Sequence, residues 1–249
     1  MYQFFIEDEN AAEDFVTIEG SDVNHIKNVL RMKPGEKIRV CTRSGQNYFC
    51  SISDITESFV RADILEKEAE STELPCRIYL FQGLPKNDKM EWIIQKTVEL
   101  GVYEVIPVAM KNCVVKLDDK KAKSKVARWQ AIAESAAKQS KRSLIPEVKM
   151  PMSYKEAAAY AKQLDVKLVP YENEHGMAGT KAAVEQIQMG QSIAVFIGPE
   201  GGFAPEEIEL VQDEMQLISL GKRILRTETA GIAALAILGY QLESSGVIE

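Results

Sequence analysis

The stretch that decides the fold is IAVFIGPEGGFAPEE, residues 193–207. Its first five residues are apolar, which predicts a buried strand over residues 193–197. The glycine-rich segment that follows predicts a tight turn, because glycine tolerates backbone angles that other residues avoid. Pro205 suits the first position of a helix, which we expect over residues 205–214. A strand, a glycine turn and a helix in succession are typical of an α/β layer.

The same alternation recurs on both sides of this stretch. Strands are expected at residues 77–82, 102–108, 166–170, 193–197 and 217–220, and helices at residues 88–100, 120–140, 180–188, 205–214 and 228–242. Asp88 with Glu91, and Ser153 with Glu156, have the spacing of a helix capping box. Such alternation predicts an α/β domain with a mostly parallel sheet, in which ligands bind beyond the carboxyl ends of the strands.

The first 70 residues have a different pattern. Short β-rich segments at residues 38–41, 48–52 and 59–64 are bounded by turn residues, and only residues 22–30 look helical, with Ser21 or Asp22 able to cap that helix. This predicts a small β-barrel or sandwich. The acidic residues 66–73, ending before Pro75, predict an exposed linker. We therefore expect two domains, residues 1–72 and residues 73–249.

Composition excludes several classes of protein. The chain has 249 residues, of which 45% are hydrophobic and 27% are charged, as in ordinary globular proteins. No apolar run approaches the roughly 18 residues that a membrane span needs. The N-terminus becomes acidic at once, so we expect a cytoplasmic protein with no membrane partner. Four cysteines without any CxxC pair and only two histidines predict reduced thiols and no metal site.

Charge is unevenly distributed along the chain. The net charge is −7, yet residues 111–149 hold 11 Lys/Arg against 4 Asp/Glu. One interpretation of this basic stretch is a solvated helix face. The other is a surface that contacts phosphates of a nucleic acid, with Lys121, Lys123 and Lys125 as its candidates.

Two loops could carry a ligand. In the glycine turn, Gly198, Gly201 and Gly202 let the backbone approach a ligand closely, and we expect a positive φ at Gly201. The segment SLGKRILRTETA, residues 219–230, leaves Leu220, Ile224 and Leu225 in a loop where something must cover them. A flat apolar ligand such as an adenine ring would do so; alternatively, these side chains plug the edge of the sheet.

Common nucleotide-binding and hydrolase motifs do not occur. The chain has no G-x-G-x-x-G after its first α/β strand, no G-x-x-x-x-G-K-[ST], no G-x-S-x-G and no H-E-x-x-H. Ordinary Rossmann, P-loop and serine-hydrolase interpretations are therefore excluded.

Five ordered motifs resemble one known family. They are HIKNVLRMKPG at residues 25–35, KNDKMEWIIQKTVELG at 86–101, ESAAKQSKR at 134–142, IGPEGGF at 197–203 and LGKRILRTETA at 220–230. Together they resemble the RsmE-type ribosomal small-subunit RNA uracil-N3 methyltransferases of the SPOUT superfamily, over essentially the whole chain. The resemblance implies a PUA-like β-barrel that binds RNA, followed by a SPOUT-type trefoil-knotted α/β domain. It also implies a homodimer that uses S-adenosylmethionine.

The resemblance and the loop chemistry together give the expected cofactor site. Its candidates are Val169, Gly198, Glu200, Gly201, Gly202, Leu220, Gly221, Ile224, Leu225 and Thr227. Backbone amides suit the edge of adenine, and the apolar side chains suit its faces.

The expected reaction is methyl transfer from S-adenosylmethionine to N3 of a uridine in small-subunit (16S) ribosomal RNA, without a metal. The candidate catalytic residues are Arg142, which could stabilise a uracil anion, and Arg226 and Glu228 beside the cofactor loop, of which Glu228 could take the N3 proton, directly or through water. The alternative for Arg142 is a contact with an RNA phosphate. Arg31, Lys89 and Gln139 are expected to position the RNA, either free or within the small subunit. Two alternatives stay open: ribose 2′-O methylation of RNA, and a non-catalytic RNA-binding module.

Overall fold

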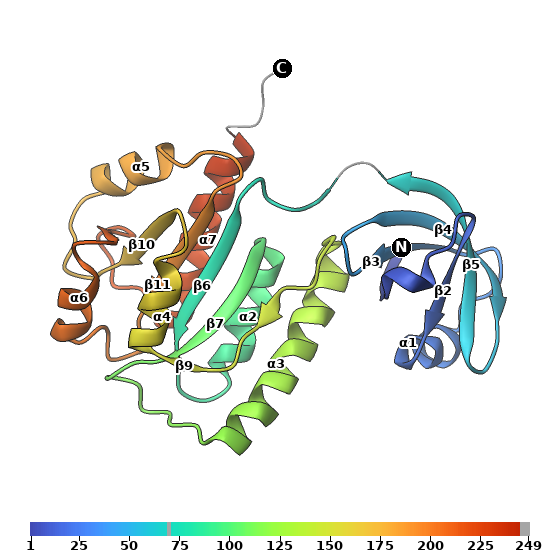
Figure 1. The fold of residues 1–249 in the computed structure, drawn as a ribbon, viewed down its shortest axis with the longest axis horizontal. Coiled ribbons are helices and arrows are strands. Elements are labelled where there is room, and N and C mark those ends of the chain that lie inside the picture. The colour runs from blue at the N-terminus through green and yellow to red at the C-terminus, as the bar shows by residue number, and fades with distance from the viewer. Residues whose placement is uncertain (69–70, 245–249) are drawn as a thin grey trace. The chain divides into compact units, whose positions relative to one another are not determined.

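The computed structural model describes residues 1–68 and 71–244, which form two compact units (Figure 1). The first unit comprises Met1–Glu73 and Ala137–Ile145, and the second comprises Leu74–Ala136 and Pro146–Glu249. The division after Glu73 is one residue from the expected boundary. Residues 137–145, which the sequence assigned to the second domain, join the first unit because their contacts are with it.

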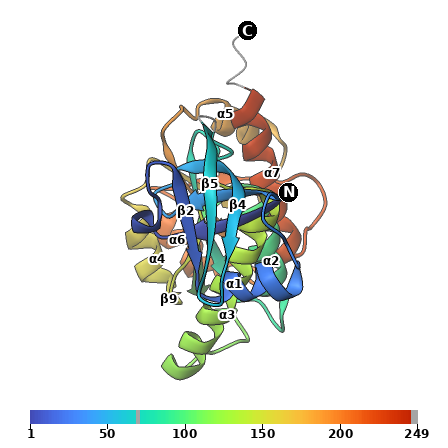
Figure 2. The same cartoon turned by 90° about the vertical axis from the view of Figure 1, so that its right-hand side faces the viewer.

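The first unit is built on a curled five-stranded sheet, which faces the viewer in Figure 2. Its strands are, in spatial order, β1 (Tyr2–Ile6), β3 (Lys37–Thr42), β4 (Asn47–Ile55), β5 (Phe59–Glu68) and β2 (Phe15–Glu19). Only β1 and β3 pair in parallel. The three expected strands are confirmed, and β1 and β2 are added to them. Phe4, Ile18 and Ile38 are among the fully buried side chains of this core.

The helical segment of the first unit begins differently from the expectation. A short helix α1 (Ser21–Asn24) continues as a π-helix, η2 (His25–Val29), and a 3-10 turn, η1 (Asp8–Asn10), precedes β2. The residue before α1 is Gly20, with a φ of 71°, and no side chain caps the helix. The expected cap by Ser21 or Asp22 is therefore wrong, because the chain enters the helix through a left-handed glycine.

The acidic linker is shorter than expected. Residues 66–68 belong to β5, where Glu68 forms an ion pair with Arg39 of β3. Residues 69–70, also expected in the linker, lie outside the described residues.

The second unit contains a parallel sheet. Its strands are, in spatial order, β12 (Gln216–Ile218), β10 (Val166–Pro170), β11 (Ser192–Ile197), β6 (Arg77–Gly83), β7 (Val102–Ala109) and β8 (Glu147–Val148), with β9 (Met152–Ser153) also paired to β7. Each of these pairings is parallel, as expected. The stacked rings of Phe81 and Phe196, 4.3 Å apart, join β6 to β11 in the core.

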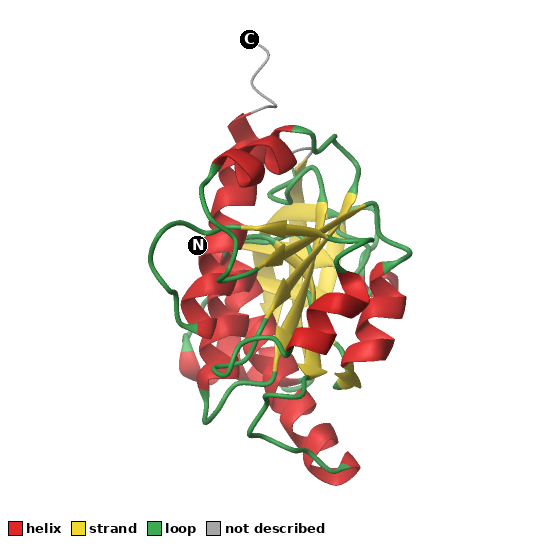
Figure 3. Ribbon diagram, turned by 90° about the vertical axis from the view of Figure 1, so that its left-hand side faces the viewer, coloured by secondary structure: helices red, strands yellow, loops and turns green. Residues whose placement is uncertain are grey.

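Helices cover both faces of this sheet (Figure 3). They are α2 (Lys89–Glu99), α3 (Asp119–Ser140), α4 (Tyr154–Ala161), α5 (Ala178–Glu185), α6 (Pro205–Val211) and α7 (Thr227–Ser244). The capping box of Ser153 and Glu156 is present at the start of α4. The one expected at Asp88 is absent, since the Asp88 side chain makes no capping hydrogen bond and Glu91 pairs with Arg128.

The cysteines of the chain are thiols inside the fold. All four, Cys41, Cys50, Cys76 and Cys113, are free and buried, as expected. Burial raises the pKa of Cys41 and of Cys50 to about 12, so both stay protonated at neutral pH.

Within residues 1–68 and 71–244, no cluster of three or more metal-ligating side chains occurs, and no helix is both long and apolar enough to cross a membrane.

Candidate active site

A cavity of about 630 Å³ lies in the second unit, beyond the carboxyl ends of β10, β11 and β12. Three loops enclose it: residues 171–177 after β10, residues 198–204 after β11 and residues 219–226 after β12. These strands are neighbours and run in parallel, so their loops meet at one edge of the sheet. The two segments that the sequence singled out are thereby brought together.

Most of the expected cofactor residues line this cavity. Those that do are Gly198, Glu200, Gly202, Leu220, Gly221, Ile224, Leu225 and Thr227. Val169 is fully buried behind the lining, in the strand β10. Gly201 is also outside the lining, although both of its neighbours are in it.

The backbone geometry of the glycine turn at Gly201 and Gly202 differs from the one expected from the sequence. Gly202, not Gly201, has the positive φ, at 67°. The expectation for Gly201 is therefore wrong. Its lack of a side chain serves another purpose, since a Cβ there would lie 3.0 Å from Cβ of Asn112. At Gly202 a Cβ would lie 3.0 Å from Oε1 of Glu172, which also lines the cavity. A side chain at Gly201 would therefore require Asn112 to shift, and one at Gly202 would be strained by the positive φ.

The loop after β12 exposes apolar surface to the cavity. Ile224 is 89% exposed, while Leu220 and Leu225 are partly buried. An apolar side chain this exposed beside a cavity favours a ligand with an apolar face over a plug of the sheet edge. Arg226 also lines the cavity, so this loop offers both an apolar surface and a positive charge.

An ion-pair cluster stands at the cavity. Nζ of Lys89 lies 3.0 Å from Oε1 of Glu200 and 3.2 Å from Oε2 of Glu228. Hydrogen bonding to Glu200, with a further contribution from Glu228, raises the pKa of Lys89. Partial burial of Glu200 opposes ionisation, but its hydrogen bonds with backbone N–H groups and with Lys89 lower its pKa overall. Glu200 and Lys89 are therefore both charged at neutral pH.

A buried chain of hydrogen bonds connects the glycine turn to α7. Nε2 of Gln82, at the end of β6, donates to Oγ1 of Thr227 at 2.9 Å, and Thr227 donates to the carbonyl oxygen of Gly198 at 2.6 Å. Gln82 is fully buried, and its Oε1 has no hydrogen-bond partner among the described residues. The sequence motifs do not predict a role for Gln82. Its only signal in the sequence is a polar residue after the apolar residues 78–81 of the strand RIYLFQG.

The three expected catalytic residues lie in different surroundings. Arg226 lines the cavity, and Glu228 contacts its edge through Lys89. Arg142 belongs to the first unit, where it is 3% exposed. Its guanidinium is paired with Glu73, and its carbonyl accepts a hydrogen bond of 2.6 Å from Nε2 of Gln3. The guanidinium therefore makes a structural contact in this chain, and its catalytic role stays a prediction.

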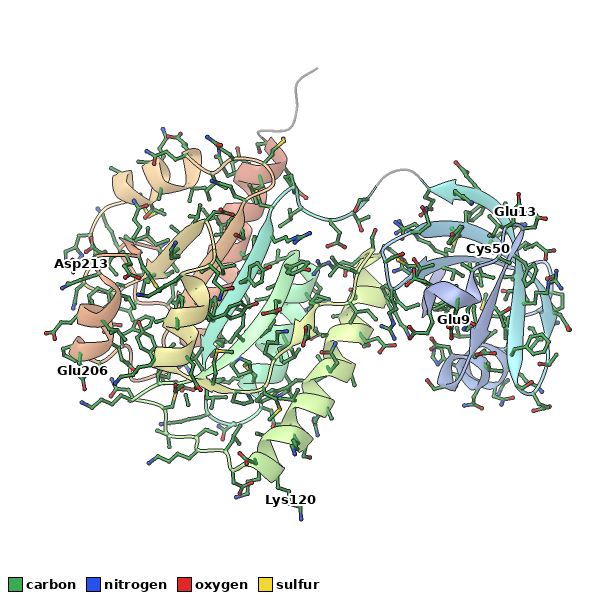
Figure 4. All side chains as sticks on the ribbon, in the orientation of Figure 1. Glu9, Glu13, Cys50, Lys120, Glu206 and Asp213 are labelled. Atoms are coloured by element: carbon green, nitrogen blue, oxygen red, sulfur yellow. The ribbon has the colours of Figure 1, made fainter. Side chains whose placement is uncertain are left out.

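The expected RNA-binding residues are distributed over both units. Arg31 and Gln139 are exposed in the first unit, and Arg31 has a φ of 54°. Lys121, Lys123 and Lys125 are on the first turns of α3, close in sequence to Lys120, which Figure 4 labels at the start of that helix. Lys121 and Lys125 form ion pairs with Asp118 and Asp88 at 3.4 and 3.7 Å. Exposed pairs of this kind contribute little and leave the lysines available to phosphates.

Comparison with known proteins covers both parts of the chain. Residues 72–239 match the family model described as an RNA methyltransferase domain, and residues 18–65 match the RNA methyltransferase PUA domain. A curated relative, the ribosomal RNA small subunit methyltransferase E of Bacillus subtilis (strain 168), is 39% identical over 250 residues, which is 98% of each chain.

Two solved structures have the same fold over nearly the whole chain. One is a ribosomal RNA small subunit methyltransferase E from Neisseria gonorrhoeae bound to S-adenosylmethionine, with a TM-score of 0.83, 31% identity and coverage of 96% of this chain and 97% of that one. The other is a putative methyltransferase from Legionella pneumophila, also with bound S-adenosylmethionine, with a TM-score of 0.84, 30% identity and the same coverage.

Proposed function

The chain belongs to the RNA methyltransferase family of ribosomal RNA small subunit methyltransferase E, and from this premise we propose that it methylates N3 of a uridine in small-subunit ribosomal RNA. Its cofactor is S-adenosylmethionine, and its substrate is ribosomal RNA. The observation that carries the proposal is the cavity of about 630 Å³ enclosed by three loops at one edge of the parallel sheet.

The residues around the cavity fit this cofactor. Its adenine needs a flat apolar surface and backbone groups at its edge, which Leu220, Leu225 and the turn at residues 198–202 can provide. Gly202 leaves open the space that a Cβ would fill. The carboxylate and the two positive charges of the cofactor meet side chains of both signs, since Arg226 and Glu200 both line the cavity.

The chain must remove a proton from uracil and stabilise the resulting charge. When bound, the cofactor supplies an electrophilic methyl group on a sulfonium. We assign the proton on N3 to the carboxylate of Glu228, and stabilisation of negative charge on the flanking uracil oxygens to the guanidinium of Arg226. Lys89 holds Glu228 at the cavity through their 3.2 Å ion pair. Arg142 remains a second candidate for stabilising the anion.

The RNA would be held by positive and polar side chains from both units. Lys121, Lys123 and Lys125 suit phosphate contacts, and Arg31 and Gln139 suit positioning of the strand. Lys89, expected to position RNA, is also the ion-pair partner of Glu200, which lines the cavity, and of Glu228. We further propose that the enzyme is a homodimer in the cytoplasm and that it acts on free ribosomal RNA or on the small subunit.

The decisive experiment combines binding and product analysis. Small ribosomal subunits purified from a strain lacking this gene are incubated with the protein and S-adenosylmethionine, and the nucleosides are fragmented by mass spectrometry. A methyl group on the uracil base supports the proposal, whereas a methyl group on ribose would replace it by 2′-O methylation. No cofactor binding in calorimetry at millimolar ligand would leave only an RNA-binding module.

A further inference from the structure

The loop between β7 and α3 begins directly beside the glycine turn. We infer that Asn112, in this loop, is a positioning residue that holds the turn in the shape that binds the cofactor. The inference rests on the proposed function, because it concerns the same cavity. It assigns a role to a residue that does not line that cavity.

Asn112 donates to two successive carbonyl groups of the turn. Its Nδ2 lies 3.0 Å from the carbonyl oxygen of Gly201 and 3.2 Å from that of Gly202. Both partners can only accept hydrogen bonds, so the amide nitrogen rather than the amide oxygen must face the turn. A single side chain therefore fixes two neighbouring peptide groups.

The close approach of Asn112 accounts for the glycine at position 201. A Cβ at this position would be 3.0 Å from Cβ of Asn112 and 3.3 Å from its carbonyl oxygen. Since the φ of Gly201 is not positive, backbone angles do not require glycine here. A Cβ at this position would instead press against Asn112, so glycine lets the loop approach the turn closely.

The same loop is also attached to the helix that follows the turn. The backbone N–H of Lys111 donates to Oε1 of Glu207 at 2.8 Å, and the N–H of Ala204 donates to Oε2 of the same buried carboxylate at 2.9 Å. The side chain of Lys111 pairs with Glu206, which Figure 4 labels on α6. The two hydrogen bonds to Glu207 fix the end of the turn, and Asn112 is the side chain of this loop that donates to Gly201 and Gly202.

A glycine-rich segment has many accessible conformations, and ordering it opposes binding. Two hydrogen bonds from Asn112 keep the turn ordered before the cofactor arrives. Asn112 is exposed, so these bonds contribute little to global stability. Its removal should therefore weaken cofactor binding much more than it lowers the melting temperature.

The test uses the whole chain with Asn112→Ala and Asn112→Asp. The aspartate keeps the shape of the side chain but places a carboxylate against two carbonyl oxygens. The matched control is Glu206→Gln, which removes the ion pair between the same loop and α6 but leaves Asn112 in place. Affinity for S-adenosylmethionine is measured by calorimetry, and the turn is followed without cofactor by hydrogen exchange of the Gly202 amide, which donates to the carbonyl oxygen of Pro199 at 2.9 Å.

We expect the dissociation constant of both Asn112 variants to rise about tenfold, equivalent to about 1.4 kcal/mol. The Gly202 amide should exchange faster, the KM for the cofactor should rise, and kcat at saturating cofactor should stay within about twofold of the unsubstituted chain. Glu206→Gln should leave both affinity and exchange unchanged.

Two results overturn different statements. If the Asn112 variants bind the cofactor as tightly as the unsubstituted chain, the inference is wrong and the turn is held by its other contacts. If the unsubstituted chain itself binds no S-adenosylmethionine, the proposed function fails. Exchange of the Gly202 amide then still decides whether Asn112 orders the turn, and unchanged exchange rejects it.

Discussion

At the scale of a single residue, both the backbone angle and the surroundings of Gly202 disfavour a side chain. Its φ of 67° is one that residues with a side chain rarely adopt, and a Cβ would lie 3.0 Å from Oε1 of Glu172. We expect Gly202→Val to abolish binding of S-adenosylmethionine in calorimetry while the circular dichroism spectrum stays near that of the unsubstituted chain. The control is Gly239→Ala in α7, where a Cβ meets nothing within 4 Å. Binding by the Gly202 variant would show that the cofactor does not depend on this turn.

Arg142 has two roles to separate, one structural and one catalytic. Its buried ion pair with Glu73 predicts that Arg142→Ala lowers the free energy of unfolding by about 3 kcal/mol, since an unpaired carboxylate stays behind. A catalytic role predicts an additional loss of rate, worth roughly 2.7–4 kcal/mol in activation free energy, with little change in cofactor affinity.

Glu73→Gln is the matched variant for this question, because it disrupts the same pair without removing the guanidinium. Both variants are compared in single-turnover methylation of saturating ribosomal subunits, at a temperature where both are folded. A slow Arg142→Ala beside a normal Glu73→Gln supports the catalytic role. Equal rates in all three proteins would leave Arg142 as a structural residue and Arg226 as the single candidate for stabilising the uracil anion.

At the scale of an element, α3 carries the basic surface. We expect the combined change of Lys121, Lys123 and Lys125 to Glu to weaken binding of substrate RNA and to reduce the dependence of log affinity on log salt by about 2, because contacts with phosphates release counterions. Affinity for S-adenosylmethionine should not change. The comparison is a triple Glu variant at Lys155, Lys162 and Lys181, which makes the same change in charge on or beside α4 and α5. If the dependence of log affinity on log salt does not change, these lysines do not contact phosphates, and the basic surface of α3 is only a solvated helix face.

The elements of the site were predictable to different degrees. The sequence predicts both loops, because glycines in a turn and apolar residues in a loop are local signals. It does not predict the roles of Asn112 and Gln82. Their roles come from contacts with residues 89 or more positions away, at Gly201 and at Thr227, and nothing in their own sequence surroundings announces those contacts.

At the scale of the whole molecule, the prediction concerns the number of copies that form the enzyme. The proposed homodimer predicts a mass of twice 27.8 kDa by light scattering at micromolar concentration, unchanged on dilution to concentrations used in the methylation assay. A mass of 27.8 kDa would contradict the dimer.

The sequence by itself determined the class of each part of this protein. Alternating strands and helices predicted the parallel sheet, and β-rich segments with turns predicted the small sheet before it. Both predictions are possible because the spacing of hydrophobic residues and the residues that form turns are local properties of the sequence. The five motifs predicted the family, its cofactor and the turn at residues 198–202.

Only the tertiary structure decided how these parts combine. It assigned residues 137–145 to the first unit, where Ser143 and Arg142 bond to Asn47 and Glu73. In the structure the positive φ is at Gly202 rather than at the expected Gly201, and Lys89 forms ion pairs with both Glu200 and Glu228. The place of residues 137–145 and the ion pairs of Lys89 depend on side chains that packing within each unit brings together from distant positions in the sequence. A local pattern predicts which elements form, but the packing of those elements decides which side chains meet.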